Sequence, residues 1–352
     1  CFKNCDVVDL TFACIGAVDA LENCLDWVRV HPEKKAIVIA SDVAKYELGS
    51  SGEYTQGAGA VSMLITSEPD LLAIEKTIGI SMEHVSDFFK PRIRVDNEYL
   101  KKNNITVQQL TNSKKEKIEF YFEEPVFDGQ YSNECYQNRI AEGLNHFKSQ
   151  KSIDFLNDWN HMIFHLPYAY QGRRMMLDIW LEWIKENNLI SKLEDEIGLM
   201  NNSEFKNWRK AASKSVMYQN FIENKIKDGE MASSYIGNMY TASIFMSLIS
   251  LLYCAFDKKR EIKGDNVGFL SYGSGSKSKI FQGKFSSKWK QKVTNLHVMK
   301  DINSRTIIDF HSYEKLHNGA LNVPIVNNEN IILKSIVESE NKEGFRHYIK
   351  NE

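Results

Sequence analysis

Apolar and polar positions follow two different periods along the first part of the chain, and together they predict a mixed α/β fold. Residues 17–30 carry apolar side chains at helical spacing, which predicts an amphipathic helix. Residues 36–40 and 57–65 are continuous apolar runs, typical of strands covered on both faces. Residues 7–12 are expected to form a short buried strand, and residues 71–80 a further strand. This order fits one half of a layered α/β fold.

The pattern changes in residues 92–124, which are rich in Lys, Asn, Glu and Gln and have weak periodicity. We expect a surface excursion there, with a marginal helix and a short strand at 118–122. The rest of the pattern predicts helices at 132–147, 172–185, 205–225 and 235–256, and strands at 162–164, 267–272 and 331–336. Ser132 is the expected N-cap of the first of these helices. The apolar run 244–256 contains two serines, which favours a buried helix over a membrane span.

The composition of the chain argues against several classes of protein. The chain has 352 residues, is 43% hydrophobic and carries a net charge of −2, so no global field points to nucleic acid or an anionic membrane. Its six cysteines show no CxxC spacing, which predicts reduced thiols and neither a disulfide scaffold nor a metal site. The sequence starts with Cys1 instead of Met and enters strand-like sequence almost at once. We interpret it as a chain that lacks its beginning.

The segment TFACIGA places Cys14 between a predicted strand and a predicted helix. The positive end of a helix dipole favours a thiolate, and the small neighbours Ala13, Gly16 and Ala17 leave room for a substrate. A buried structural cysteine is the alternative.

Three further features are candidates for chemistry. His165 follows a predicted strand and precedes Pro167, so it is expected to project into a ligand crevice or to be a satisfied structural histidine. Asn238 precedes a very apolar helix, where it could cap a turn or hold a carbonyl oxygen. Residues 271–276, SYGSGS, resemble a tight loop that approaches a ligand closely, or an ordinary hairpin turn.

Taken together and in order, these elements resemble the 3-hydroxy-3-methylglutaryl-CoA synthases of the thiolase superfamily. The similar segments are ACIGA around Cys14, ASDVAKYELGSSGEYTQGAGAVSMLI, DFFKP, FDGQYSNECY, FHLPY, YIGNMYTASIFMSLISLL and GFLSYGSGS. They extend over nearly the whole chain. The resemblance implies a layered α-β-α-β-α fold of two similar halves, the first lacking its N-terminal strands. We expect residues 1–82 to belong to the first half and residues 83–352 to the second.

The resemblance also implies a chemistry. Cys14 matches the nucleophile that acetyl-CoA acetylates, and His165 and Asn238 match the residues that hold the acetoacetyl thioester. The implied reaction is a Claisen-type condensation followed by hydrolysis, with two CoA thioesters as substrates and no cofactor or metal. Residues matching the family's site lining are Ser274, Asp42, Asp87, His84 and Gly57. Arg173 and Arg174 are candidates for the CoA phosphates or a solvent-facing pair, and Tyr170 for the pantetheine tunnel.

The sequence departs from the family pattern in one part of the machinery. The family's acid/base glutamate lies roughly thirty residues before the nucleophile, a distance given by the resemblance. Only thirteen residues precede Cys14 here, and none is Glu. We therefore assign that role to no residue and expect the chain to be a fragment, or part of a split enzyme, that is inactive alone with an unpaired sheet edge. The segment 92–124 is a second departure, expected to be a solvated surface insertion.

Three functions remain open. The first is a cytoplasmic, homodimeric acyltransferase of the mevalonate pathway, supplying isoprenoid biosynthesis. The second is a polyketide β-branching relative that acts on a β-ketoacyl carrier protein; the sequence AYQGRRMM after the histidine lacks the run expected of those relatives, which favours the first. The third is a degenerate binding protein, which the joint presence of Cys14, His165, Asn238 and Ser274 disfavours.

Overall fold

The computed structural model describes residues 4–105, 117–121, 124–321, 325, 331–337, 342 and 344–350. The chain divides into two compact units, one formed by Cys1–Pro91 and Phe122–Met299 and the other by Arg92–Tyr121 and Lys300–Glu352. Every candidate site residue belongs to the first unit. The predicted division at residues 82 and 83 stays a prediction.

A five-stranded sheet forms the centre of the first unit. Its strand order is β3 (Leu72–Ile74), β11 (Lys277–Phe285), β10 (Asn266–Gly273) and β9 (His161–Phe164), and β4 (Gly79–Met82) also pairs with β11. Strands β9 and β10 are parallel, and the other pairs are antiparallel. The predicted strands at 162–164 and 267–272 are confirmed, whereas the predicted strand at 71–80 is two short strands.

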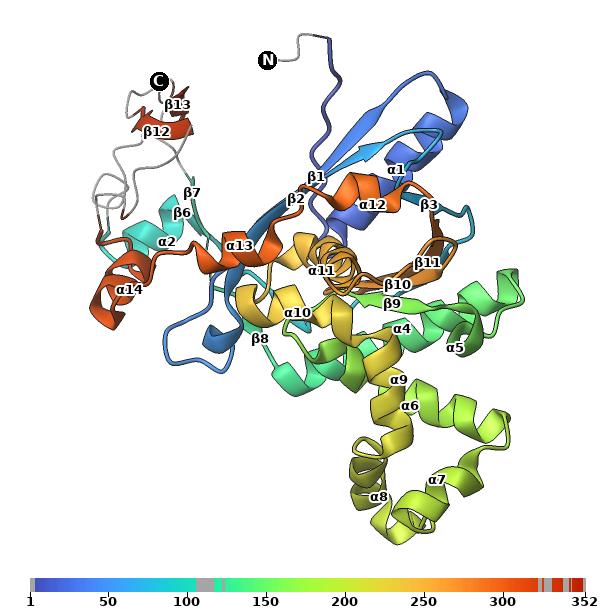
Figure 1. Ribbon diagram of the computed structural model, residues 1–352. Helices are drawn as coiled ribbons and strands as arrows, with labels where there is room; N and C mark the ends of the chain where they lie inside the picture. Colours follow the sequence, from blue (N-terminus) through green and yellow to red (C-terminus); the bar gives the residue numbers. More distant parts are fainter. Residues whose placement is uncertain are drawn as a thin grey trace. The chain divides into compact units, whose positions relative to one another are not determined.

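Strands β9 and β10 in this sheet are buried on both faces, because the sheet contributes to two hydrophobic clusters, whereas one face of β4 is exposed. Leu270 and Tyr272 of β10 join the cluster that contains α4 (Gly129–Gln150) and α6 (Gln171–Glu186). Val267 and Phe269 join the cluster that contains α1 (Gly16–Val30) and α11 (Ser243–Asp257). Side chains alternate across a strand, so a continuous apolar run supplies both clusters. Figure 1 shows the sheet between these helices.

A second sheet, β1 (Ala36–Ala44) with β2 (Gly57–Ile65), packs its inner face on the cluster of α1 and α11. The first unit therefore has helix, sheet, helix and sheet layers, and the α/β fold class is confirmed. The expectation that both strands are covered on both faces is wrong. Ile39 is 71% exposed and its neighbours on the same face, Ile37 and Val43, are also exposed. Burial alternates along β1 because only one side meets a helix layer.

The residues before Cys14 also differ from the prediction. Residues 7–12 form no strand, and Val7 and Val8 are 79% and 74% exposed. A buried strand needs neighbours for its backbone N–H and C=O groups. No strand among the described residues pairs with 7–11.

The helices agree with the sequence pattern except at their ends. Asp128, not Ser132, caps α4, and its carboxylate accepts from the backbone N–H groups of Gln130 and Tyr131. The predicted helix 205–225 is two helices, α8 (Phe205–Ala212) and α9 (Val216–Lys225), because Ser215 caps the second. The predicted helix 235–256 begins later, since Gly237 with φ +85° ends α10 (Lys227–Ile236).

Shorter elements complete the first unit. They are η1 (Glu53–Thr55), β5 (Phe88–Phe89), β8 (Val126–Phe127), α5 (Phe155–Asp158), α7 (Ile190–Ile197), η2 (Asn202–Glu204), η3 (Tyr240–Ala242) and α12 (Trp289–Val293). Helix α13 (Val298–Asn303) lies where the chain passes from one unit to the other.

The second unit contains most of the predicted polar insertion. Its elements are β6 (Arg92–Asp96), α2 (Asn97–Lys102), β7 (Lys117–Tyr121), α14 (Phe310–His317), β12 (Ile331–Ile336) and β13 (Arg346–Lys350). The predicted helix and strand of the insertion are present, but residues 106–116 and 122–123 lie outside the described residues. The strand at 331–336 is confirmed, and the tail expected to be polar supplies its partner, β13.

One segment, Tyr240–Asp257, is apolar and long enough to cross a membrane by length and composition. It is 67% buried inside the first unit, as α11 packs on β9 and α10. This agrees with the expectation of a core helix.

Candidate active site

Cys14 lies at the entry to α1, just after a residue with an unusual backbone. Ala13 has φ +42°, in the left-handed region, and α1 begins at Gly16. The first turn of the helix is held from a distant part of the chain, because Ala17 N donates to Thr241 Oγ1 at 2.7 Å. The nucleophile candidate and the segment after Asn238 are therefore neighbours.

Aromatic side chains surround Cys14. Its cluster contains Tyr46 and Tyr240, with the rings of Phe88 and Phe127 packed against them. The thiol is 9% exposed, and burial, followed by the charges of Asp42 and Asp87, raises its pKa well above the usual range. The expectation that the helix dipole favours a thiolate stays a prediction, and burial and the two carboxylates act against it.

His165 is buried directly after β9, and Tyr136 connects it to the surroundings of Cys14. The Tyr136 hydroxyl donates to the backbone oxygen of His165 at 2.6 Å, and burial, followed by the nearby Cys14, raises the pKa of Tyr136. Burial lowers the pKa of His165 to about 3, so its imidazole is neutral at physiological pH. Its Nδ1 is buried without a hydrogen-bond partner in the described structure. Such an atom is costly unless a ligand satisfies it.

Asn238 is held rigidly beside the same cluster. Its Oδ1 accepts from Tyr240 N at 2.8 Å and from Ser243 Oγ at 3.2 Å. Its Nδ2 donates one hydrogen to the Tyr46 hydroxyl at 3.2 Å. An amide nitrogen carries two hydrogens, so the second is free of this bond and can face a ligand.

Gly57 explains why Asn238 can lie there. A Cβ on Gly57 would lie 2.4 Å from the backbone oxygen of Ile236 and 2.6 Å from that of Asn238. Both atoms belong to the main chain and cannot rotate away. The first residue of β2 therefore has to be glycine for the 236–238 backbone to pass against it.

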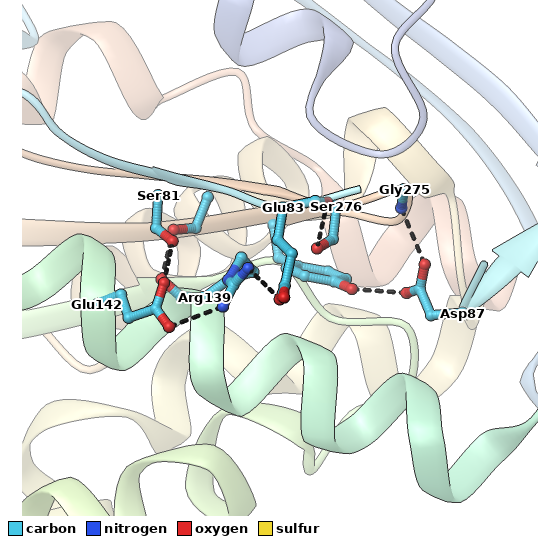
Figure 2. Close-up of polar contacts among 9 residues, drawn as sticks. Ser81, Glu83, Asp87, Arg139, Glu142, Gly275 and Ser276 are labelled. Carbon is cyan, nitrogen blue, oxygen red and sulfur yellow. Dashed lines mark hydrogen bonds and ion pairs between the residues drawn. The ribbon is translucent and has the colours of Figure 1, made fainter. Parts of the chain in front are cut away.

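Asp87 fixes the glycine-serine loop after β10. It is fully buried, accepts from the Tyr272 hydroxyl at 2.6 Å and accepts from Gly275 N at 2.8 Å. Figure 2 shows its carboxylate pointing to Gly275. Ser274 lies in this loop, between Gly273 and Gly275. The Asp87 carboxylate thus joins its own segment to a loop that is far away in the sequence.

The loop also approaches the nucleophile. A Cβ on Gly273 would lie 2.8 Å from the backbone nitrogen of Ile15, next to Cys14. Tyr272 stacks on Tyr136 with ring centroids 4.5 Å apart. His165, Asp87 and the loop with Ser274 therefore lie around Tyr136 and Tyr272. Asn238 reaches the cluster of Cys14 through Tyr46 and Tyr240.

Asp42 lies in β1 near Cys14, and burial raises its pKa while the exposed Lys90 lowers it. His84 is exposed, and within the part of the chain that the structure describes it makes no contact with Cys14. Tyr170 is 54% exposed and stacks with the Arg173 guanidinium, which is 4.6 Å from its ring centroid.

The two arginines after FHLPYAYQG have partners within the chain. Arg173 Nε donates to the buried carboxylate of Glu230 at 2.9 Å, and Arg174 donates to the Tyr168 hydroxyl at 2.7 Å. These contacts support a structural role for Arg173. Arg174 is exposed and keeps donors that can face solvent or a ligand.

Sequence reasoning named no tyrosine of the cluster. Tyr46, Tyr136, Tyr240 and Tyr272 all fall within the quoted similar segments, so their position in these segments was the available signal. What they touch depends on chain segments more than a hundred residues apart.

The sequence predicts no metal site, and the structure can be searched for one only within its described residues. Among the described residues, no group of three or more His, Cys, Asp or Glu side chains is arranged to hold a metal ion.

Comparison with known proteins gives two family matches along the chain. A family model described as "Hydroxymethylglutaryl-coenzyme A synthase C terminal" matches residues 116–322, and one described as "Hydroxymethylglutaryl-coenzyme A synthase N terminal" matches residues 2–70. The chain is 29% identical over 316 residues to a hydroxymethylglutaryl-CoA synthase of Enterococcus faecalis, covering 89% of this chain and 65% of that protein.

A mitochondrial synthase of Bos taurus is 30% identical over 305 residues, covering 80% of this chain and 54% of its own length. A cytoplasmic synthase of Mus musculus is 28% identical over 303 residues, covering 80% of this chain and 52% of its own length. The chain thus spans between about half and two thirds of the length of these relatives.

Solved structures give the same fold. "MvaS in complex with 3-hydroxy-3-methylglutaryl coenzyme A" superposes with a TM-score of 0.73 at 22% identity, covering 100% of this chain and 76% of that chain. "Crystal Structure of the Curacin Biosynthetic Pathway HMG Synthase" superposes with a TM-score of 0.70 at 17% identity, covering 99% and 75%. At these identities the likeness concerns the fold alone.

Proposed function

Since the chain belongs to the hydroxymethylglutaryl-CoA synthase family, we propose that it carries the acyl-accepting and acceptor-binding parts of such a synthase. The observation that carries this proposal is the position of Cys14. Its thiol lies in an aromatic cluster with Tyr46 and Tyr240, next to the loop with Ser274 and to Asp87. The proposed substrates are acetyl-CoA as donor and acetoacetyl-CoA as acceptor, with no cofactor and no metal.

In the first step, Cys14 Sγ attacks the acetyl thioester and CoA leaves as its thiol. A thiol suits this exchange because sulfur is a soft nucleophile that readily attacks a thioester carbonyl. Burial, followed by the charges of Asp42 and Asp87, raises the pKa of Cys14, so the free protein keeps a thiol, and the departing CoA sulfur takes up a proton as the thioester to Cys14 forms.

In the second step, the acceptor ketone develops negative charge on its oxygen. Asn238 has an amide hydrogen beyond its bond to Tyr46, and His165 is neutral with an unpartnered Nδ1. We assign these two groups to the acceptor thioester and its ketone. Fixed donors at such a position lower the barrier because they need no reorganisation during reaction.

Acetyl transfer tests the first step. The chain is incubated with labelled acetyl-CoA, and the label is located by mass spectrometry of its peptides. Label is expected on Cys14, and Cys14→Ala should remove it. Cys254→Ala is the matched control, because Cys254 is also buried, in α11. No label on the unchanged chain, or label retained by Cys14→Ala, contradicts the proposal.

Binding of the acceptor tests the second step. His165→Asn should weaken acetoacetyl-CoA binding about tenfold or more, the loss expected for a hydrogen bond worth about 1.5 kcal/mol, and leave acetylation of Cys14 intact. An acetoacetyl carrier protein is the competing acceptor. Preference for the carrier protein over acetoacetyl-CoA would favour the polyketide alternative.

Overall condensation needs an acid/base group that we assign to no residue of this sequence. We therefore propose that the 352-residue chain accepts acetyl groups without completing turnover alone. Normal release of the condensed product by this chain would contradict this.

Assembly and location are further proposals. We propose a homodimer in the cytoplasm, acting in the mevalonate pathway, on the basis of family membership. Sedimentation of the purified chain and fluorescence of a tagged chain in cells test these two points. A monomer, or an organellar signal, would contradict them.

A further inference from the structure

Arg139 is a charged side chain that the proposed reaction does not use, although it is only 4% exposed. It lies in the middle of α4, on the helix face that packs against β4 and β11. Its Nη1 donates to Glu83 Oε2 at 2.5 Å, and its Nη2 donates to Glu142 Oε1 at 2.7 Å. Burying a guanidinium is costly, so its two carboxylate partners are needed to hold it there.

The two carboxylates have similar exposure and different attachments. The side chains of Glu83 and Glu142 are 59% and 55% exposed. Glu142 accepts a second bond, from Ser81 Oγ at 2.5 Å in β4. The backbone of Glu83 instead forms a reciprocal pair with Ser276, with Ser276 N donating to Glu83 O at 2.6 Å and Glu83 N donating to Ser276 O at 3.0 Å.

Glu83 is therefore the point where α4 meets the glycine-serine loop. Two residues further on, Val85 N donates to Gly275 O at 2.8 Å, and Asp87 then accepts from Gly275 N. Figure 2 shows this order of contacts, from Glu142 and Arg139 through Glu83 and Ser276 to Gly275 and Asp87. Backbone hydrogen bonds hold the segment 83–87 against the loop 273–276. Arg139 holds the first residue of that segment, Glu83, through its side chain.

We propose that Arg139 is a positioning residue, which acts through Glu83 to hold the 273–276 loop against the nucleophile. The loop presents Ser274 at its tip, and Gly273 packs against the backbone of Ile15 beside Cys14. When the Arg139–Glu83 pair is lost, the loop and Asp87 move relative to the thiol. A displacement of about 1 Å in a reacting group can cost a hundredfold in rate.

The two partners of Arg139 provide the experiment. Arg139→Gln, Glu83→Gln and Glu142→Gln are compared for the rate of acetyl transfer to Cys14, the KM for acetyl-CoA and the thermal midpoint. We expect Arg139→Gln and Glu83→Gln to lower the saturating rate at least about tenfold with KM unchanged. Glu142→Gln should stay within about twofold of the unchanged chain, since it loses a similar ion pair that does not reach the loop. Arg139→Lys should restore part of the rate.

The acetyl-transfer rate of a double variant distinguishes a positioning role of Arg139 from a general effect on stability. The double variant Arg139→Gln/Glu83→Gln should be no slower than Arg139→Gln alone, because both remove one contact. Equal losses in Glu83→Gln and Glu142→Gln, or a rate that follows the thermal midpoint across all variants, would overturn the proposal. If Arg139→Gln does not fold, Glu83→Gln against Glu142→Gln decides alone, since both side chains are largely exposed.

The inference rests on the proposed acyl transfer, and a second readout keeps the two apart. The alkylation rate of Cys14 by iodoacetamide, measured against pH, needs no acetyl-CoA. Arg139→Gln and Glu83→Gln should shift this profile, because Asp87 raises the pKa of Cys14 and moves with the loop. A shifted profile in a chain that accepts no acetyl group would sustain the positioning role and reject the proposed function. An unchanged profile would reject the positioning role.

Discussion

The Tyr272 hydroxyl donates to Asp87 Oδ2 at 2.6 Å, which joins two residues 185 positions apart in the sequence. Both residues are buried, and Asp87 accepts from Gly275 N through its other oxygen. The carboxylate thereby receives one bond on each oxygen. This pair decides where the glycine-serine loop lies relative to Cys14.

Removing the Tyr272 hydroxyl should be costly. Tyr272→Phe leaves a buried carboxylate oxygen without a donor, and we expect a loss of about 2–3 kcal/mol in the free energy of unfolding. Tyr136→Phe is the matched control, because its hydroxyl donates to the neutral backbone oxygen of His165. It should cost about 1 kcal/mol. Urea denaturation measures both, and an equal or smaller loss in Tyr272→Phe would be inconsistent with the charged bond.

Gly57→Ala should destabilise the fold by about 1–3 kcal/mol, because its Cβ would meet two main-chain oxygens that cannot move aside. It should also displace Asn238 and weaken acetoacetyl-CoA binding. Gly129→Ala is the control, since a Cβ there would meet only the Phe127 ring at 3.9 Å. That change should be neutral or slightly stabilising at the start of a helix. Denaturation curves that rank the two variants the other way would refute the close-approach argument.

The reactivity of Cys14 should rise only at high pH. Its pKa is raised by burial first and by Asp42 and Asp87 next. Because the folded pKa exceeds the unfolded one, this group contributes stability below the ordinary thiol pKa of about 8.5, and that stability is lost as pH rises above it. Alkylation of the Cys14 peptide by iodoacetamide should therefore still increase above pH 9. Asp42→Asn should move the profile to lower pH without restoring an ordinary thiol, since burial remains; a profile unmoved by this change would remove Asp42 from the causes.

His165 should make the fold sensitive to acid. Burial lowers its pKa to about 3, below the ordinary value of 6.5. A depressed pKa of this kind contributes stability that is present above pH 6.5 and is lost as pH falls from 6.5 towards 3. The loss reaches at most about 1.4 kcal/mol per pH unit for one proton.

His165→Gln should reduce that slope, measured by denaturation at several pH values. His161 is also buried with a lowered pKa, so His161→Gln should give a second, separate reduction. An acid slope identical in His165→Gln and the unchanged chain would show that His165 is protonated without cost.

Periodicity identified most elements because it reports local burial. The amphipathic pattern of 17–30 gave α1 within one residue, and the apolar runs gave β1, β2, β9 and β10. Periodicity gave wrong predictions where a residue's burial depends on a partner segment that is distant in the sequence. Residues 7–12 have strand composition without a paired strand among the described residues, and β1 has an apolar outer face that is exposed. An apolar composition indicates that a segment tends to be buried, but whether it is buried depends on which elements pack against it in the folded chain.

The sequence by itself determined the family and its nucleophile candidate, because ordered local segments such as ACIGA and FHLPY are read without knowing their neighbours. Only the tertiary structure decided the state of those residues. Burial among aromatic side chains from distant segments, followed by the charges of Asp42 and Asp87, raises the pKa of Cys14 and favours the thiol over the thiolate. Arg139 stood out in no motif, and its role follows from which of its two carboxylates is attached to the loop. Desolvation and hydrogen bonding act through space, so the order of residues alone does not contain them.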